Sequence, residues 1–246
     1  MKNIISEPPL VTIFMPCLNE EQNVAPSLDT VARTMREVGY SCEILIFDDH
    51  STDKTIERIN EYCICHPEIA IRLVRNKRIL GLGYNYVEGA YQGRGTYYML
   101  INSDNSEPVS SLVAILSQLD KADMIIPYLG KRDSRRRRRR LVSSLFTWLI
   151  NLLNHQSIRY YNGPVLHLRY NVMRWHPDSH GFAYQAELIS RLLGFGMTYK
   201  EVQISNIDRI SGTTKAFTLD NLLSILHSMF QILVRRLKNV IERKSS

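Results

Sequence analysis

The stretch "TYYMLINSDNSEP", residues 96–108, joins an apolar run to a cluster of Asn, Ser, Asp and Glu. Residues 96–101 have the aromatic and aliphatic composition of a buried strand, so the polar cluster begins where that strand is expected to end. Asp104 supplies a carboxylate there, and Asn102 and Ser106 supply neutral oxygens. Such hard oxygen ligands suit Mg²⁺ or Mn²⁺, but an Asx-turn at a strand end uses the same residue types. Both interpretations remain open for this stretch taken alone.

Apolar runs and helical patterns alternate through residues 1–130. Further strands are expected at 11–15, 42–47, 71–74 and 123–128, and helices near 24–38, 54–62 and 110–119. Strands that alternate with helices predict an α/β fold with a mostly parallel sheet and helices on both faces. Beyond residue 130 the pattern is less regular, with helices expected at 141–158 and 183–196 and a strand at 198–204.

Polar pairs follow the first, second and fourth of these strands, namely Asn19 and Glu20, Asp48 and Asp49, and Asn102 and Asp104. The carboxyl ends of parallel strands meet at one edge of a sheet, where ligands of such folds bind, so the three pairs are expected to converge. The adjacent aspartates suit a base or a ribose hydroxyl. Alternatively they are solvent-exposed acids beside a helix that Ser51, Thr52 or Asp53 caps.

Charge is divided unevenly along the 246 residues. Residues 1–130 contain 11 Lys and Arg against 17 Asp and Glu, whereas residues 131–246 contain 20 against 7. An anionic partner is therefore expected at the second half. The four cysteines are expected to be reduced thiols, because no second Cys or His pair stands at zinc spacing from Cys63 and Cys65. Neither a signal peptide nor a clear transmembrane segment is expected.

Six consecutive arginines, 135–140, precede a helical pattern that places apolar residues on one face: Leu141, Leu145, Trp148, Leu149 and Leu152. No nucleic-acid-binding motif accompanies the run, so nucleic acid is not the expected partner. A basic run beside an amphipathic helix is typical of a helix in the interface of an anionic membrane. The alternatives are a solvated loop or contact with substrate phosphate, for which Arg140 is the best candidate. Segment 218–246 is expected to be a second amphipathic, basic helix.

Five motifs occur in a specific order: "MPCLNEEQNV" (15–24), "ILIFDDHSTDKT" (44–55), "GLGYNYVEGA" (81–90), "INSDNSEP" (101–108) and "RISGTTK" (209–215). Together they resemble the family 2 glycosyltransferases, which have the Rossmann-like GT-A fold, and in particular the dolichol- and polyprenyl-phosphate mannosyltransferase-like branch. The resemblance covers about residues 8–217. It implies a transferase domain over 1–217, with a nucleotide-binding half at 8–130 and an acceptor- and membrane-facing half at 131–217.

The resemblance also implies roles for residues in these motifs. A nucleotide-diphosphate sugar would be bound by Pro16, Asn19, Glu20, Asp48, Asp49, Gly81, Asn85, Asn102, Arg140, Gly212 and Thr214. The D-x-D element implies a Mg²⁺ or Mn²⁺ cofactor at Asn102 and Asp104, with Ser106 beside them. Arg209 and Lys215 would act in catalysis by offsetting the charge of the leaving diphosphate.

Two positions depart from the family pattern. Asn102 stands where the D-x-D element has its first carboxylate, so the affinity for a cation is expected to be lower. His50 stands where the family usually has Gly after the paired aspartates, so the base pocket is expected to be narrower. A degenerate, non-catalytic scaffold that binds a membrane partner is therefore one alternative.

The reaction implied is an inverting displacement at the anomeric carbon of the sugar. A lipid phosphate acceptor is already anionic at neutral pH and needs no general base, whereas a glycan hydroxyl needs a carboxylate to take its proton. Glu187 is the candidate for that catalytic base, or else a glutamate on a helix surface. The sequence thus predicts a cytoplasmic, peripherally membrane-associated enzyme that glycosylates a lipid phosphate or lipid-linked acceptor, with a glycan hydroxyl as the alternative.

Overall fold

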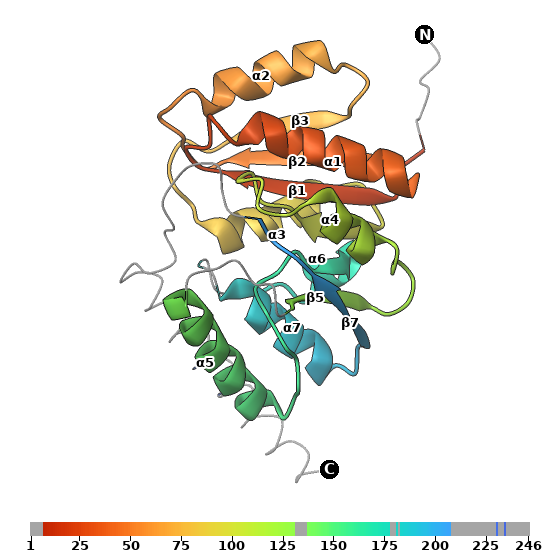
Figure 1. Cartoon of the computed structure of the whole chain (residues 1–246), viewed down its shortest axis with the longest axis vertical. Coiled ribbons are helices and arrows are strands. Elements are labelled where there is room, and N and C mark those ends of the chain that lie inside the picture. The colour runs from red at the N-terminus through yellow and green to blue at the C-terminus, as the bar shows by residue number, and fades with distance from the viewer. Residues whose placement is uncertain are drawn as a thin grey trace.

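The computed structural model describes residues 7–130, 137–177, 181, 183–207, 230 and 234. Its centre is one seven-stranded sheet in the order β3-β2-β1-β4-β6-β5-β7 (Figure 1). The strands are β1 (Val11–Cys17), β2 (Cys42–Asp48), β3 (Ile71–Arg75), β4 (Tyr97–Leu100), β5 (Met124–Leu129), β6 (Leu166–Leu168) and β7 (Tyr199–Ile204). All pairings except those of β6 are parallel, so the predicted α/β fold with a mostly parallel sheet is confirmed.

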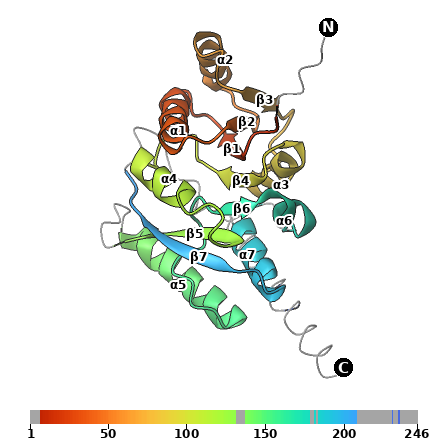
Figure 2. The same cartoon turned by 90° about the vertical axis from the view of Figure 1, so that its right-hand side faces the viewer.

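Helices cover both faces of the sheet, as Figure 2 shows. One face carries α1 (Val24–Val38), α2 (Thr55–Cys65) and α4 (Val109–Leu116). The other carries α3 (Leu82–Gln92), α5 (Arg137–Asn154), α6 (Arg169–Arg174) and α7 (Tyr184–Gly194). Successive side chains of a strand point to opposite faces, so in β1 Ile13 and Met15 enter the core under α1 while Phe14 enters the core under α3.

The sequence of α1 explains both its packing and its end. Val24, Leu28, Val31 and Met35 recur at helical spacing, and all four are buried against the sheet. The helix stops at Gly39, whose backbone is left-handed with φ 72° and whose N–H donates to the Met35 carbonyl at 3.0 Å. The chain can therefore turn back at once into β2, which lies directly beside β1.

The register of the strands aligns their carboxyl ends. Cys17 at the end of β1 lies opposite Asp48 at the end of β2, and Phe14 lies opposite Leu100 at the end of β4. The loops that follow β1, β2 and β4 therefore leave the sheet at the same edge. We call this edge, with those three loops, the carboxyl edge.

β6 and α6 were not expected from the sequence. β6 runs antiparallel between β4 and β5, with Leu166 paired to both Met99 and Ile125. Three residues are too few to show an alternation, and the middle one, His167, is polar yet fully buried. Burial lowers the pKa of His167 from 6.5 to about 3, and neither ring nitrogen has a hydrogen-bond partner among the described residues. His167 is thus a neutral side chain of the core.

At the opposite edge, where the parallel strands begin, buried Glu43 at the start of β2 joins several segments of the chain. Its carboxylate accepts hydrogen bonds from the Thr12 hydroxyl at 2.7 Å, and from the N–H and Nε of Arg94 at 2.5 and 3.1 Å. Burial acts to raise the pKa of Glu43, but these hydrogen bonds and the positive charge of Arg94 lower it overall. The beginnings of β1, β2 and β4 are therefore joined by one ionised carboxylate.

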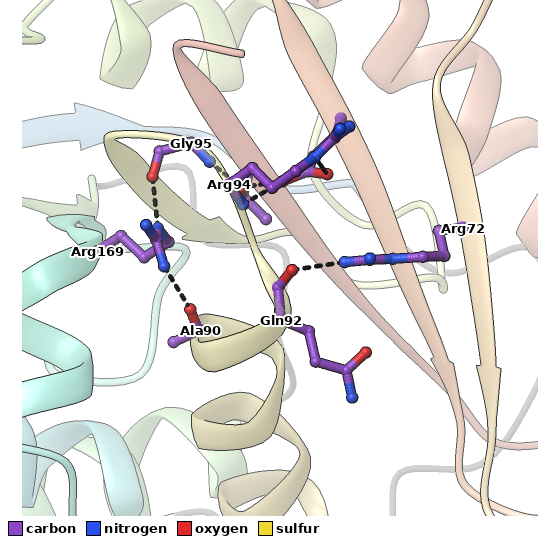
Figure 3. A network of polar contacts seen from close by, with 8 residues as sticks. Arg72, Ala90, Gln92, Arg94, Gly95 and Arg169 are labelled. Atoms are coloured by element: carbon purple, nitrogen blue, oxygen red, sulfur yellow. Dashed lines mark hydrogen bonds and ion pairs between the residues drawn. The ribbon is translucent and has the colours of Figure 1, made fainter. Parts of the chain in front are cut away.

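Two further arginines at this edge bind the last turn of α3 (Figure 3). Arg72 donates to the Gln92 carbonyl at 2.6 Å, and Arg169 donates to the Ala90 carbonyl at 3.0 Å and the Gly95 carbonyl at 2.6 Å. Carbonyls at the C-terminus of a helix lack helical partners and carry partial negative charge, so cationic donors stabilise them. These contacts fix the C-terminal end of α3.

The second half of the chain differs from its expected boundaries at α5. Within the described residues this helix runs from Arg137, inside the arginine run, to Asn154, whereas residues 141–158 were expected. No helix in the described part of the chain is long and apolar enough to cross a bilayer. The helix expected at 218–246 lies outside the described residues, apart from two isolated positions.

Candidate functional site

The loops after β1 and β2 are bonded to each other at the carboxyl edge. The Asn19 N–H donates to the Ser51 hydroxyl at 2.9 Å, and the Thr52 N–H donates to the Asn19 side-chain oxygen at 2.8 Å. The Glu20 N–H donates to the Thr55 hydroxyl at 2.8 Å. Of the residues expected to cap α2, Ser51 and Thr52 bond to the β1 loop instead, whereas Asp53 Oδ1 accepts from the N–H of Thr55, the first residue of the helix, at 3.0 Å.

The loop after β4 is bonded to the end of β1. The Ser103 hydroxyl donates to the Pro16 carbonyl at 2.6 Å. The next carbonyl of β1, that of Cys17, accepts from the Asp49 N–H at 2.8 Å. Two adjacent residues of β1 thus hold the β4 loop on one side and the β2 loop on the other. The polar residues of the three loops are brought together at one edge.

Asp48 is buried at the end of β2 but makes little use of its carboxylate. It is 1% exposed, and the Ser51 N–H lies 3.3 Å from each of its two oxygens. These contacts are longer than an ordinary hydrogen bond to a carboxylate. Asp48 is therefore the acid of the adjacent pair whose carboxylate is less engaged by the protein.

Asp49 binds the segment that leads into α3. Its Oδ1 accepts from Asn76 Nδ2 and from the Leu80 N–H, both at 2.9 Å, and its Oδ2 accepts from the Gly81 N–H at 3.0 Å. Asn76 Nδ2 also donates to Asn85 Oδ1 at 2.8 Å. Burial acts to raise the pKa of Asp49, but the hydrogen bonds lower it overall. Asp49 thus holds residues 76–81 and the start of α3 at the carboxyl edge.

Each of the three loops contains one non-glycine residue with a left-handed backbone. These are Asn19 with φ 58°, His50 with φ 72° and Asn105 with φ 55°. Such a conformation costs on the order of 1 kcal/mol per residue, and it concentrates at ligand sites. The exposed His50 ring makes no hydrogen bond, ion pair or ring contact with the described residues. The Gly usual at this position in the family would adopt the same backbone without strain.

Asn102, Asp104 and Ser106 form a compact turn after β4. Asp104 Oδ1 accepts from the Ser106 N–H at 3.1 Å, as in the Asx-turn considered from the sequence. Asn102 Nδ2 donates to Glu107 Oε1 at 2.7 Å. The Asx-turn and a cation site are compatible here, because each of the two oxygens of a carboxylate can accept more than one partner.

Glu107 was not singled out from the sequence, although it is the fourth acidic or amide side chain in "NSDNSE". It is 8% exposed, and its Oε2 is buried without a hydrogen-bond partner among the described residues. Burial raises the pKa of Glu107 to about 7, with a further rise from the negative Asp104 and an opposing effect of hydrogen bonding by Asn102 and Ser106. A buried carboxylate with an unsatisfied oxygen beside Asp104 marks this turn as more than a surface loop.

The chemistry of this turn fits a hard divalent cation. Asp104 offers a carboxylate, Asn102 a side-chain carbonyl and Ser106 a hydroxyl, all oxygen ligands of the kind that Mg²⁺ and Mn²⁺ prefer. Across the described ranges, no three His, Cys, Asp or Glu side chains are grouped as a complete metal cage. A Mg²⁺ site that uses one or two carboxylates and substrate phosphates does not require such a cage.

Glu187 and Arg140 lie on the helices of the second half. Glu187 is fully buried in α7, where its carboxylate forms an ion pair with Arg191 at 3.2 Å, and Arg191 also donates to the His176 carbonyl. The opposite charge compensates for burying the carboxylate. Arg140 is exposed in the first turns of α5. The roles expected of both residues remain predictions.

The residues of the late basic motif, Arg209, Gly212, Thr214 and Lys215, lie outside the described residues. The continuous described chain ends at Ile207, and the Ile207 N–H donates to the Ser106 carbonyl at 3.0 Å. The chain is therefore at the carboxyl edge two residues before Arg209.

Four of the five residues of α5 that the sequence marked as an apolar face are exposed, and the fifth, Leu149, is half-buried. Leu141, Leu145, Trp148 and Leu152 are 71, 57, 58 and 56% exposed, while Phe146 and Ile150 on the other face pack into the core. Arg137, Arg138 and Arg140 are exposed in the first turns of the same helix. We call the exposed apolar residues and these arginines together the α5 surface.

The fold and the motifs at the carboxyl edge define the class of this protein. Residues 12–181 match Glycosyl transferase family 2, well over half of the chain, so the chain belongs to this family. The seven-stranded sheet, with its one antiparallel strand inserted among parallel ones, is the GT-A fold.

Curated relatives include a dodecaprenyl-phosphate galacturonate synthase from Rhizobium johnstonii, 25% identical over 126 residues. The match covers 51% of this chain and 37% of that protein. A dolichyl-phosphate beta-glucosyltransferase from Trichomonas vaginalis is 26% identical over 126 residues, or 47% of this chain and 37% of the relative. The chain thus spans little more than a third of these relatives.

Similar solved structures include glucosyl-3-phosphoglycerate synthase from Mycobacterium tuberculosis in complex with Mn²⁺, UDP and glucosyl-3-phosphoglycerate. It has a TM-score of 0.68 and 16% identity, and the match covers 93% of this chain and 80% of that one. A mannosyltransferase from Pyrobaculum calidifontis in complex with GDP-mannose and Mn²⁺ also has a TM-score of 0.68, with 15% identity over 94% of this chain and 65% of that one.

Proposed function

We propose that this chain is a glycosyltransferase that moves a sugar from a nucleotide-diphosphate sugar to a polyprenyl phosphate or another lipid-linked acceptor. The transfer takes place at an anionic membrane surface, uses Mg²⁺ or Mn²⁺ and inverts the anomeric carbon. The observation that carries the proposal is the meeting of three polar loops at the carboxyl edge, bonded to one another through Pro16, Cys17 and Asn19. Family membership and relatives named for polyprenyl-phosphate and dolichyl-phosphate substrates support it.

The donor nucleotide lies in this proposal against the loops after β1 and β2. Asp48, whose carboxylate is little engaged by the protein, accepts hydrogen bonds from the base or the ribose. Asp49 acts indirectly, because its carboxylate is already occupied in holding residues 76–81. Asn19, Glu20 and the backbone near Pro16 complete this side of the donor site.

The diphosphate lies against the turn after β4. Asp104, Asn102 and Ser106 hold the cation, which when bound offsets the charge of the departing nucleotide diphosphate. Arg209 and Lys215 add positive charge to the same group. The contact of Ile207 with Ser106 supports this assignment, because Arg209 follows only two residues later.

A phosphate acceptor fits the surroundings of Glu187. An acceptor hydroxyl needs a base with a free lone pair at the reacting proton, whereas the carboxylate of Glu187 is buried and paired with Arg191. An anionic phosphate oxygen attacks the sugar without a base. In this proposal Glu187 therefore positions Arg191 and α7 and does not transfer a proton.

The α5 surface is the part of the chain that meets the membrane. Its exposed apolar side chains include Leu145 and Trp148, and exposed arginines precede them on the same helix. Anionic lipid headgroups would attract these arginines, and the apolar side chains would enter the headgroup boundary.

A transfer assay tests the reaction. The purified chain is incubated with polyprenyl phosphate, Mn²⁺ and each of radiolabelled UDP-, GDP- and dTDP-sugars, and the product is partitioned between butanol and water. We expect label in butanol with one donor, and loss of that label in Asp104→Ala. The matched control is Asp123→Ala, a half-buried aspartate just before β5 that bonds to Thr198, which should retain activity.

The other outcomes separate the alternatives. Label that remains in water with an added glycan identifies a hydroxyl acceptor. No transfer, together with no heat of binding for any donor in calorimetry with Mn²⁺, identifies a non-catalytic scaffold. Full activity of Asp104→Ala would contradict the assignment of the cation site.

A vesicle assay tests the α5 surface. The chain should sediment with vesicles that contain phosphatidylglycerol more than with neutral vesicles, and added salt should weaken binding. The double change Leu145→Ser with Trp148→Ser should weaken binding about tenfold or more, because each buried apolar side chain contributes about 1.5–3 kcal/mol. Tyr170→Ser, an exposed aromatic on α6, is the control. Equal binding of both variants would contradict the assignment.

A further inference from the structure

Asn102 and Glu107 form a hydrogen-bonded pair. Asn102 Nδ2 donates to Glu107 Oε1 at 2.7 Å, and the ionised form of this carboxylate, which a nearby divalent cation would favour, can only accept. The amide group of Asn102 is therefore fixed with its nitrogen toward Glu107. Its Oδ1, on the other side of the same planar group, is held in one orientation.

This orientation matters because an asparagine can ligate a cation through only one of its two terminal atoms. A carboxylate at the same position would offer an oxygen in either orientation of the group, whereas an amide that is turned by half a rotation presents its NH₂. Asn102 thus needs a partner that selects the orientation. Glu107 is such a partner.

The second consequence of Asn102 concerns charge. With an amide at position 102, Asp104 is the one carboxylate among the three proposed ligands. The attraction for a divalent cation is then weaker than with two ligating carboxylates. Glu107 belongs to the same turn as Asp104, three residues further on, and its Oε2 is buried with no hydrogen-bond partner among the described residues. Glu107 is more than nine-tenths buried, so its interaction with a nearby cation is screened little by water.

We propose that Glu107 is a positioning residue of the cation site. It holds the Asn102 amide so that Oδ1 faces the cation together with Asp104, and it supplies the negative charge that Asn102 lacks. The inference rests on the proposed function, since the cation is the one that binds the diphosphate of the donor. The site then has two carboxylates with different roles. Asp104 ligates the cation, and Glu107 binds the neutral ligand Asn102 from the side away from the cation.

The test measures Mn²⁺ affinity directly, by electron paramagnetic resonance of free Mn²⁺, with UDP or GDP added. Glu107→Gln keeps an acceptor oxygen for Asn102 but removes the charge, and we expect about tenfold weaker Mn²⁺ binding. Glu107→Leu removes charge and acceptor together and should weaken binding further. Glu61→Gln, at an exposed glutamate of α2 that pairs with Arg58, is the matched control and should bind as the wild type does.

The decisive variant exchanges the two groups. In Asn102→Asp with Glu107→Gln, the hydrogen bond is kept with donor and acceptor reversed, and the number of carboxylates is unchanged. Mn²⁺ affinity should return to within about threefold of the wild type, because both the charge and the orientation are restored. Asn102→Asp alone should lower the melting temperature in EDTA, since it places two carboxylates in contact, and Glu107→Gln should remove that loss.

The outcomes distinguish this inference from the proposed function. If the wild type binds Mn²⁺ and Glu107→Gln binds it equally well, or if the exchange restores nothing, the role of Glu107 is wrong and the proposed function stands. If the wild type binds no Mn²⁺ with either nucleotide, the cation-dependent function fails and this inference fails with it.

Discussion

The two adjacent aspartates after β2 should respond in opposite ways to loss of charge. In Asp49→Asn, one acceptor oxygen becomes an NH₂ group that faces the N–H of Gly81 or, if the amide is turned, those of Leu80 and Asn76. In the better orientation the amide oxygen keeps two neutral hydrogen bonds, and the new NH₂ group faces the Gly81 N–H. The third hydrogen bond is then lost, and two hydrogen-bond donors point at each other. Hydrogen bonds to a charged group contribute about 1.5–3 kcal/mol against about 1 for neutral ones, so we expect a loss of about 3 kcal/mol in the free energy of unfolding.

Asp48→Asn is the matched control. The carboxylate of Asp48 faces one N–H, that of Ser51, at 3.3 Å from each oxygen, so an amide oxygen replaces it at a cost below about 1 kcal/mol. Asp48→Asn should instead weaken nucleotide binding in calorimetry. The two substitutions thus separate the acid that holds residues 76–81 from the acid that meets the donor.

Urea unfolding followed by circular dichroism measures the difference, and its pH dependence provides a second check. The pKa of Asp49 is lower in the folded chain than in the unfolded chain, so its contribution is complete above about pH 4 and is lost as the pH falls through the folded pKa. The gap between wild type and Asp49→Asn should therefore close in acid. A loss under 1 kcal/mol in Asp49→Asn at about pH 7, or an equal loss in Asp48→Asn, would refute this reasoning.

Three further predictions concern the core and the cation. His167 is protonated at about pH 6.5 in the unfolded chain and only at about 3 in the folded chain. The free energy of unfolding of the wild type should therefore fall by about 2 kcal/mol between about pH 7.5 and 5 because of this residue. Urea unfolding should not detect that part of the loss in His167→Leu. Gly89→Ala places a methyl group 2.5 Å from the Tyr98 hydroxyl and 2.7 Å from a Phe14 ring carbon, so it should destabilise by about 1–3 kcal/mol, whereas Gly194→Ala meets no atom within 4 Å and should stabilise by about 0.5–1 kcal/mol. EDTA should abolish the rise in melting temperature that UDP or GDP with Mn²⁺ produces, and a rise that persists in EDTA would contradict a cation in the donor site.

Much of the fold could be predicted because burial imposes a period on the sequence. β1 and β2 are short apolar runs, and α1 repeats its buried residues at helical spacing, so both signals are strong. β6 has three residues, pairs with strands distant in sequence and has buried His167 at its centre, so local periodicity carried no signal. Its place in the sheet is decided by tertiary contacts.

The sequence allowed the loops of the candidate site to be predicted, but not which contacts each of their residues makes. Parallel order brings Asp48 and Asp104 to one edge, and that order follows from alternating strands and helices. The sequence does not reveal that Asp49 is occupied by backbone N–H groups or that Glu107 is buried against Asn102. Those facts depend on how loops distant in sequence fold against each other, for which residue type alone is a weak guide.

Helix α3 connects the two opposite edges of the sheet as a rigid rod. Its N-terminal end meets Asp49 through Gly81, and its C-terminal carbonyls are held by Arg72 and Arg169. Its 11 residues, at about 1.5 Å per residue, give a length of about 16 Å. A change at Arg169 or Arg72 therefore acts on the same helix whose other end is held by Asp49 at the carboxyl edge. In the proposed function, this makes the remote arginine pair a place where the shape of the donor site could be adjusted without touching the donor.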